Sequence, residues 1–126
     1  MKRFVEDIEE LSEKNKDLRR VLHTSKHLQL VLTSLKPGEE TGDDVHPEHD
    51  HFFRVERGKG ELVLEGDRIK LKSNDAVIVP AGAHHNVINT GEKPMKIFII
   101  YAPPHDPDLK VDNAAAGGAD VGAEGR

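Results

Sequence analysis

The sequence lacks cysteine and tryptophan altogether, and it contains one tyrosine and four phenylalanines. The absence of cysteine excludes a disulfide scaffold, a thiolate zinc site, an iron–sulfur cluster and a cysteine nucleophile. It also fits a reducing compartment, so we expect a cytoplasmic protein. Any metal bound by this chain must therefore be held by nitrogen and oxygen ligands.

Long apolar runs and an excess of positive charge are missing as well. The longest apolar stretch, residues 97–102, is far shorter than the roughly 20 residues that a membrane-spanning helix needs. Residues 1–7 carry acids and no apolar segment of the kind found in secretory signals. Lys and Arg number 18 against 23 Asp and Glu, and this negative balance disfavours binding to nucleic-acid phosphates. We therefore expect neither a membrane nor a nucleic-acid partner.

Histidine, by contrast, is abundant, with eight residues in a chain of 126. Three of them, His46, His49 and His51, lie close together in the sequence. The chain length fits one domain, because domains commonly contain roughly 100–150 residues. A surplus of imidazoles in a small protein without thiols makes metal binding the first function to consider.

The hydrophobic pattern predicts a helical N-terminus followed by an all-β domain. Residues 3–22 have apolar side chains at helical spacing, with acids early and bases late, as the helix dipole prefers; the polar run at residues 12–17 leaves open a break into two short helices. Short apolar or alternating runs follow, separated by Gly and Pro, and one of these separators is a tight hairpin signal at Gly66-Asp67. We predict strands at residues 27–35, 51–56, 61–64, 68–72, 75–79, 86–89 and 95–101. This spacing is typical of an antiparallel sandwich or barrel.

The same pattern divides the chain into three parts. We predict an N-terminal helical extension over residues 1–24, a β-barrel domain over 25–105 and a flexible tail over 106–126. The tail is poor in apolar residues and cannot offset the entropy cost of its own ordering. Because small β-domains gain by covering exposed sheet edges, we also predict a homodimer, in which the N-terminal helix or the strand at 27–35 covers a partner's edge.

Two segments resemble the two sequence motifs of the cupin superfamily, namely PGEETGDDVHPEHDHFFRVERGKG at residues 37–60 and NDAVIVPAGAHHNVINTG at residues 74–91. In the second segment, Asn74 stands where the family has Gly, and Asn tolerates a positive φ better than most residues. The other positions of this motif match the family's spacing: Pro80, Gly82, His85 and Asn89.

The first motif can be placed in two registers. A literal match uses His49, His51 and Glu56, but this register has no Gly at either flanking position. The other register is anchored on Gly38 and Gly58, and we favour it because glycines fix the backbone at turns, where a slip of one residue would turn every side chain to the opposite face. The favoured register assigns three ligand positions: Asp44, His46 and His51.

The resemblance implies a single-domain cupin β-barrel, also called a double-stranded β-helix or jelly roll, with a metal site inside it. Within a strand, Asp44 and His46 would point to one side, and His51 has the parity of the apolar Phe53. The predicted metal ligands are Asp44, His46, His51 and His85. Such a donor set suits Fe, Mn, Ni, Zn or Cu.

Segments outside the motifs narrow the resemblance further. VLTSLKPGEE at residues 31–40 and YAPPHDP at residues 101–107 are similar to a group of small microbial cupins described as mannose-6-phosphate-isomerase-like. That group more often has Gln at the position of His51, so a third imidazole departs from its pattern. For the histidines outside the ligand set we expect surface positions or no role: His23, His27, His84 and His105.

The predicted function is a metal-dependent enzyme, of the dioxygenase or other oxidoreductase type, that acts on a small oxygen-rich substrate in the barrel. Asp50 or His49, at the rim, is the expected acid or base. One alternative is a metal-dependent isomerase of a sugar or sugar phosphate. A second alternative is a non-enzymatic barrel that binds or senses a small molecule.

Overall fold

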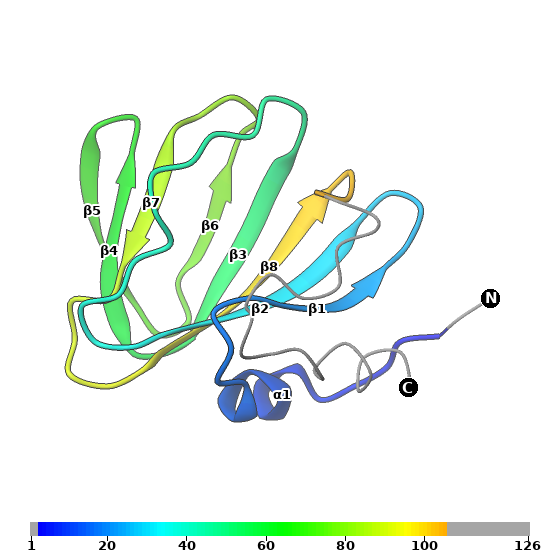
Figure 1. The fold of residues 1–126 in the computed structure, drawn as a ribbon, viewed down its shortest axis with the longest axis horizontal. Coiled ribbons are helices and arrows are strands. Elements are labelled where there is room, and N and C mark those ends of the chain that lie inside the picture. Colours follow the sequence, from blue (N-terminus) through cyan, green and yellow to red (C-terminus); the bar gives the residue numbers. More distant parts are fainter. Residues whose placement is uncertain (1–2, 106–126) are drawn as a thin grey trace.

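The computed structural model describes residues 3–105, and within this range the chain forms one short helix and eight strands. In chain order these elements are α1 (Ile8–Lys14), β1 (Arg20–Thr24), β2 (Gln29–Leu35), β3 (Asp50–Arg57), β4 (Lys59–Leu64), β5 (Asp67–Lys72), β6 (Ala76–Val79), β7 (His85–Ile88) and β8 (Met95–Ala102). The strands form two antiparallel sheets, one ordered β1-β2-β8-β3-β6 and the other β5-β4-β7 (Figure 1).

The all-β prediction is confirmed, because the seven predicted strands correspond to β2 through β8 with small shifts at their ends. The hairpin between β4 and β5 is also present, one residue earlier than predicted. Its central residues are Glu65, with φ 48°, and Gly66, with φ 86°. Two successive positive φ values are what a two-residue type I′ turn requires, and this turn matches the twist of the flanking strands.

The predicted helix over residues 3–22 is wrong in its extent. The observed α1 starts after Asp7, whose side chain accepts a hydrogen bond from the Glu10 N–H, and it ends at Asn15. The Asn15 side chain then bonds the backbone N–H and C=O of Asp17, which favours a turn over further helix. Residues 20–24 pair with β2 as a strand, so the predicted extension contains part of the large sheet. The predicted tail, residues 106–126, lies outside the described residues.

One apolar core fills the space between the two sheets. Along β3, Phe53 and Val55 alternate with more exposed neighbours and point inward, on the same side as His51. Burying side chains of this size stabilises the fold by about 1.5–3 kcal/mol each. The buried core residues come from both sheets: Leu35, Phe53, Val55, Leu62, Leu71, Val79, Val87, Met95 and Ile97.

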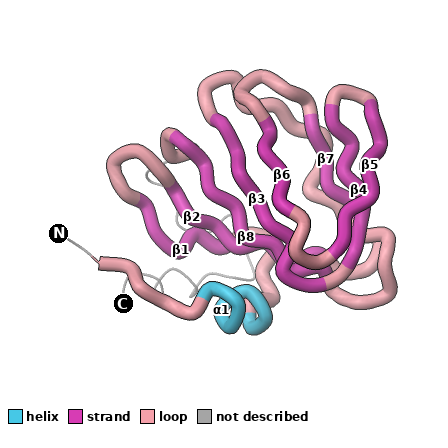
Figure 2. The backbone as a smooth tube through the Cα atoms, turned by 180° about the vertical axis from the view of Figure 1, so that it is seen from behind, coloured by secondary structure: helices cyan, strands magenta, loops and turns pink. Residues whose placement is uncertain are grey.

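The N-terminal segment covers the outer face of the five-stranded sheet, below the strands in the view of Figure 1 and again from behind in Figure 2. Phe4, Ile8 and Leu11 pack there against the buried Leu22 and Leu32. An ion pair between Arg57 on β3 and Glu13 on α1 adds a polar contact. The helix therefore belongs to the domain, and within residues 3–105 no helix is long and apolar enough to cross a membrane.

The positions of the sheet edges correct part of the dimer prediction. β2 lies between β1 and β8, so it has no open edge with which to cover a partner. The outer strands of the large sheet are β1 and β6 instead. The homodimer itself stays a prediction, which light scattering in solution would test.

Asn89, the last residue of the second motif, fastens the connection between β7 and β8. It is 1% exposed, and its Nδ2 donates to the carbonyls of Leu35 and Lys93 at 2.9 and 2.8 Å. Its Oδ1 accepts from the Gly91 N–H at 2.9 Å. One buried amide side chain thus satisfies three backbone groups at the end of the barrel away from the histidines.

We expect Asn89→Ala to lower the free energy of unfolding by about 3 kcal/mol or more, because two carbonyls and one N–H lose their partner and each loss costs about 1–3 kcal/mol. Urea denaturation measures this difference. Thr90→Ala, at the exposed neighbouring position, serves as the control and is expected to change stability little. Equal effects of the two substitutions would contradict this role of Asn89.

Candidate metal centre

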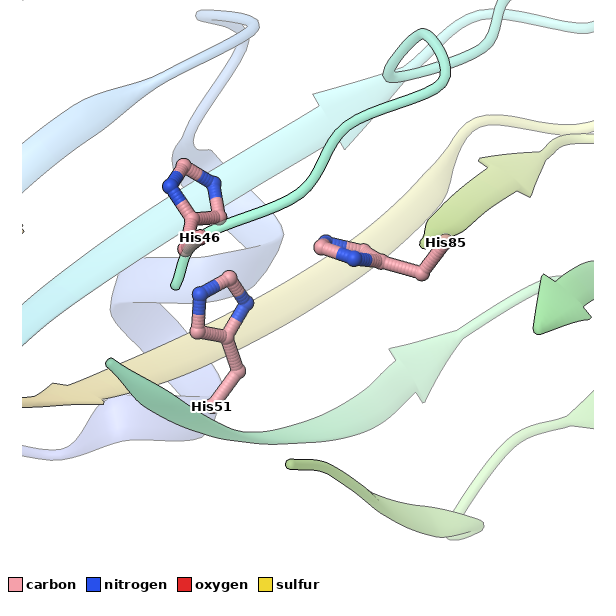
Figure 3. Close-up of side chains that lie close together, drawn as sticks. All are labelled: His46, His51 and His85. Atoms are coloured by element: carbon pink, nitrogen blue, oxygen red, sulfur yellow. The ribbon is translucent and has the colours of Figure 1, made fainter. Parts of the chain in front are cut away.

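Three imidazoles converge inside the barrel, as Figure 3 shows. His46 lies in the loop before β3, His51 is the second residue of β3, and His85 is the first residue of β7. One ring nitrogen from each lies within 4.8 Å of the other two. The ring centroid of His51 lies 4.6 Å from that of His46 and 5.0 Å from that of His85.

Backbone pairing holds this arrangement in place. The segment before β3 runs beside β7, where Asp44 and His85 exchange both backbone hydrogen bonds at 2.9 Å. The Gly82 N–H donates to the His46 carbonyl, also at 2.9 Å. Residues far apart in the sequence are therefore brought together by the same type of pairing that forms the sheets.

The buried ring of His51 has an unsatisfied nitrogen. His51 is 3% exposed, and its Nε2 has no hydrogen-bond partner among residues 3–105. Burying a polar atom without a partner is unfavourable, and such atoms are rare in folded proteins. At His85, Nδ1 lies 3.2 Å from the Ala83 carbonyl, which suits an N–H at Nδ1 and leaves Nε2 as the ligand atom. The donor set therefore fits a divalent transition metal.

Burial favours the neutral form of His46 and His51. Desolvation, reinforced by the neighbouring His46 and His85, lowers the pKa of His51 from 6.5 to about 3. Desolvation also lowers the pKa of His46, although the Asp44 carboxylate acts in the opposite direction. A metal binds the neutral form of imidazole, so this environment prepares the ligands at neutral pH.

Asp44 lies beside the cluster rather than within it. Its Oδ2 is 2.9 Å from His46 Nε2, and its side chain is 54% exposed. The three clustered nitrogens belong to histidines alone. Asp44 is thus placed to orient the ring of His46, as carboxylates beside metal-binding histidines commonly do. Its predicted role as a direct ligand stays a prediction.

The geometry supports the glycine-anchored register of the first motif. Gly38 and Gly58 have φ values of 83° and 88°, and Asn74, which replaces the motif glycine, has φ 78°. These left-handed conformations explain why those positions carry Gly or Asn. In the literal register Glu56 would be a ligand, but its buried carboxylate pairs with Arg54 and does not join the histidine cluster.

The predicted acid or base residues contact backbone groups at the rim. Asp50 accepts a hydrogen bond from the Ala81 N–H at 2.9 Å, and His49 Nδ1 lies 2.8 Å from the Pro103 carbonyl. Asp50 is exposed and His49 is half-buried, and neither lines the cavity onto which the three histidines open. Their role in proton transfer stays a prediction. His84, expected at the surface, has a side chain that is 61% exposed.

That cavity has a volume of about 140 Å³ and contains groups that the motifs did not indicate. Arg19, Tyr101 and His105 line it together with the three histidines. The His105 ring lies 4.4 Å from that of His46, although we expected no role for it. Burial, with a further contribution from the Arg19 charge, lowers the pKa of His105 to about 4. All three lie outside the two motifs, Arg19 before β1, Tyr101 near the end of β8 and His105 after it, and only an account of side-chain direction at the barrel mouth would have found them.

Comparison with known proteins defines the family. Residues 31–101 match the family model of the cupin domain, more than half of the chain, so this chain belongs to the cupin family and the predicted resemblance is confirmed. The uncharacterized protein YrkC of Bacillus subtilis is 40% identical in an alignment 126 positions long, which covers 91% of this chain and 68% of that protein. The crystal structure of BH2720 from Bacillus halodurans has a TM-score of 0.85 and 38% identity over 89% of each chain.

A more distant structure also shares the fold. A putative sugar phosphate isomerase from Acidithiobacillus ferrooxidans has a TM-score of 0.57 and 27% identity, over 60% of this chain and 50% of that chain. The common part is the barrel, and it does not extend over the whole of that protein. The cupin β-barrel fold with a short N-terminal helix is therefore established for this chain.

We expect the metal-free protein to lose stability as the pH falls from about 6.5 toward about 3. In the unfolded chain, the His51 imidazole takes up a proton below its ordinary pKa of 6.5. In the folded protein, where the pKa of His51 is lowered to about 3, the ring stays neutral until the pH nears that value. Stability is thus fully present above pH 6.5 and decreases below it. Urea unfolding of chelator-treated protein across this range measures the effect.

The matched variant is His51→Gln, in which stability should depend less on pH because the buried titrating ring is gone. His84→Gln removes an exposed ring and should keep the wild-type dependence. A His51→Gln protein with the same pH dependence as the wild type would contradict the assignment.

Proposed function

We propose that this protein is a metal-dependent enzyme that acts on a small, oxygen-rich substrate inside the barrel, with His46, His51 and His85 as the metal ligands. The observation that carries the proposal is their buried convergence, with a nitrogen of His51 that has no hydrogen-bond partner in the described chain. Bound there, Fe, Mn, Ni, Zn or Cu would supply Lewis acidity and, if redox-active, reactivity toward O2. Within this class we favour an O2-dependent oxidation.

The number of protein ligands supports an enzyme over a structural site. Structural zinc sites commonly use four protein ligands, whereas catalytic sites use three and keep a position for water or substrate. The three histidines also open onto a cavity, so a small molecule can reach them. A site built only to stabilise the fold would gain nothing from this access.

The surrounding residues would orient the ligands and exclude water. The Ala83 carbonyl holds the ring of His85, and Asp44 holds that of His46. Apolar side chains, among them Phe53 and Val87, form the inner wall of the cavity. Charges and dipoles interact more strongly beside such a wall than they do in water. Asp44 lines the cavity and is therefore better placed than Asp50 to exchange a proton with a substrate.

A second candidate is the isomerisation of a sugar or sugar phosphate. The similarity to a putative sugar phosphate isomerase and the presence of Arg19 in the cavity favour it. The cavity volume argues against it, since about 140 Å³ is close to an engineered cavity of about 150 Å³ that holds benzene. A sugar phosphate is considerably larger than benzene. Isomerisation also predicts Zn and activity without O2, which distinguishes it from the favoured reaction.

Protein purified without a histidine tag should contain close to one transition-metal ion per chain. His85→Ala should lose most of this metal, because one of three ligands is gone. His84→Ala is the matched control, since the neighbouring ring is exposed and should leave the metal content unchanged. Elemental analysis by plasma mass spectrometry measures all three proteins. A metal content that is low and insensitive to His85→Ala would rule out the metal site.

The position open to small molecules can be tested separately, and this separates an enzyme from a binding or sensing barrel. Protein loaded with Co(II) should change its visible absorption when azide is added, because azide can enter the cavity and bind the ion. A spectrum that does not respond to azide would favour a non-enzymatic barrel. Loading at the histidines is checked by the absence of the same spectrum in His85→Ala.

A further inference from the structure

Arg19 places a permanent positive charge in the wall of the histidine cavity. It lies just before β1, on the segment that follows α1, and not on a strand of the barrel interior. Its Nη1 donates a hydrogen bond to Tyr101 Oη at 2.9 Å, and its Cζ lies 5.1 Å from the centre of the Tyr101 ring. The guanidinium group therefore has a defined position against an aromatic side chain that is itself 5% exposed.

The backbone that carries Arg19 is held firmly. Asn15 is 2% exposed, and its side chain closes the turn through two hydrogen bonds to Asp17. The Asp17 carbonyl accepts from the Ser34 N–H on β2 at 3.0 Å, and Lys96 on β8 donates to the Asn15 carbonyl. Because the segment is ordered in advance, a ligand that binds Arg19 would lose little free energy in immobilising it.

The charges around the cavity favour an anion. Among the described residues that line it, Arg19 is the permanent cation and Asp44 is the acid. The Asp44 side chain is more than half exposed, and its carboxylate lies 2.9 Å from His46 Nε2, so its charge is directed toward that ring and toward solvent. A cation beside an apolar wall attracts a negatively charged ligand more strongly than one in open solvent does.

We propose that Arg19 binds the carboxylate of a small 2-hydroxy or 2-oxo acid, whose neighbouring oxygen then faces the three histidines. A guanidinium has five N–H donors in a planar fork, so it can hold Tyr101 and a carboxylate at the same time. Phosphate is the weaker match, because phosphate sites commonly combine several cationic side chains and this cavity contributes one. The proposal names a substrate class for the proposed enzyme and rests on it for the reaction, but the anion site itself requires no metal.

Isothermal titration calorimetry with three probes tests the site: glycolate, its uncharged counterpart glycolamide, and inorganic phosphate. We expect chelator-treated wild-type protein to bind glycolate more tightly than glycolamide or phosphate. Arg19→Gln should weaken glycolate binding by about tenfold to a hundredfold, the range expected for a lost hydrogen bond to a charged group. Arg19→Lys should weaken it less, because the charge is retained and the planar fork is lost.

Arg20→Gln is the matched control, since it removes the same charge from the next residue, which does not line the cavity. It should leave glycolate binding unchanged. Equal affinity of wild type and Arg19→Gln for glycolate, or no glycolate binding to wild type, would overturn the proposal. Tighter binding of phosphate would overturn the carboxylate assignment. Thermal denaturation of both Arg19 variants checks that each is folded, so that unfolding is excluded as the cause of a loss of affinity.

Metal content measured on the same proteins separates this proposal from the proposed function. Arg19→Gln should retain the wild-type amount of metal, because Arg19 is not a ligand. If wild type contains no metal but binds glycolate through Arg19, the metal-dependent enzyme fails and the anion site stands. If the metal content depends on His85 but Arg19→Gln binds glycolate as tightly as wild type, the anion site is ruled out and the metal-dependent enzyme is not.

Discussion

A buried imidazole nitrogen without a hydrogen-bond partner is the constraint around which the interior of this barrel is arranged. His51 points inward with the apolar side chains of β3, where its Nε2 has no hydrogen-bond partner within residues 3–105. The ring cannot relieve this cost by taking up a proton, because the same burial lowers its pKa to about 3. The imidazoles of His46 and His85 lie close to this ring, and a metal ion bound by one nitrogen of each of the three rings would give the His51 nitrogen a partner.

The rest of the fold holds these rings at their separations. The pairing of Asp44 with His85 aligns the segment before β3 with β7, and β3 itself lies between β8 and β6. At the opposite end of the domain, Asn89 bonds three backbone groups and so fixes the connection that follows β7. The second motif segment thus acts at both ends of β7: His85 at one end belongs to the histidine cluster, and Asn89 after the other end is fixed by hydrogen bonds to the backbone.

The glycines and the alternating apolar residues account for what the sequence made predictable. A positive φ at Gly58 and at Asn74 is a strict local requirement, which few residue types meet, so these positions are readable without a structure. The alternation of Phe53 and Val55 with outward residues likewise predicts which side of β3 is buried. The positions of the three clustered histidines follow from these two features, because their register is measured from the glycines and their direction from the strand.

The elements that were missed depend on tertiary contacts instead. Residues 20–24 have apolar residues that also fit a helix, and only pairing with β2 decides in favour of β1. His105 and Arg19 come from segments before and after the strands, where no periodicity relates a side chain to the barrel interior. A local turn at Asn15 sets the direction in which the segment carrying Arg19 approaches the cavity. The sequence pattern does not distinguish this turn from an interruption within a helix.

This placement changes the meaning of the N-terminal segment. A division at residue 24 would separate a helical extension from a self-sufficient barrel, but β1 completes the large sheet and Arg19 lines the cavity of the histidines. The segment also packs Phe4, Ile8 and Leu11 on the outer face of that sheet. These apolar contacts on the outer face therefore hold the N-terminal segment against the sheet, and they help to position Arg19 in the cavity. The chemical character of the cavity, with clustered imidazoles and a guanidinium in one lining, arises only when both parts of the chain fold together.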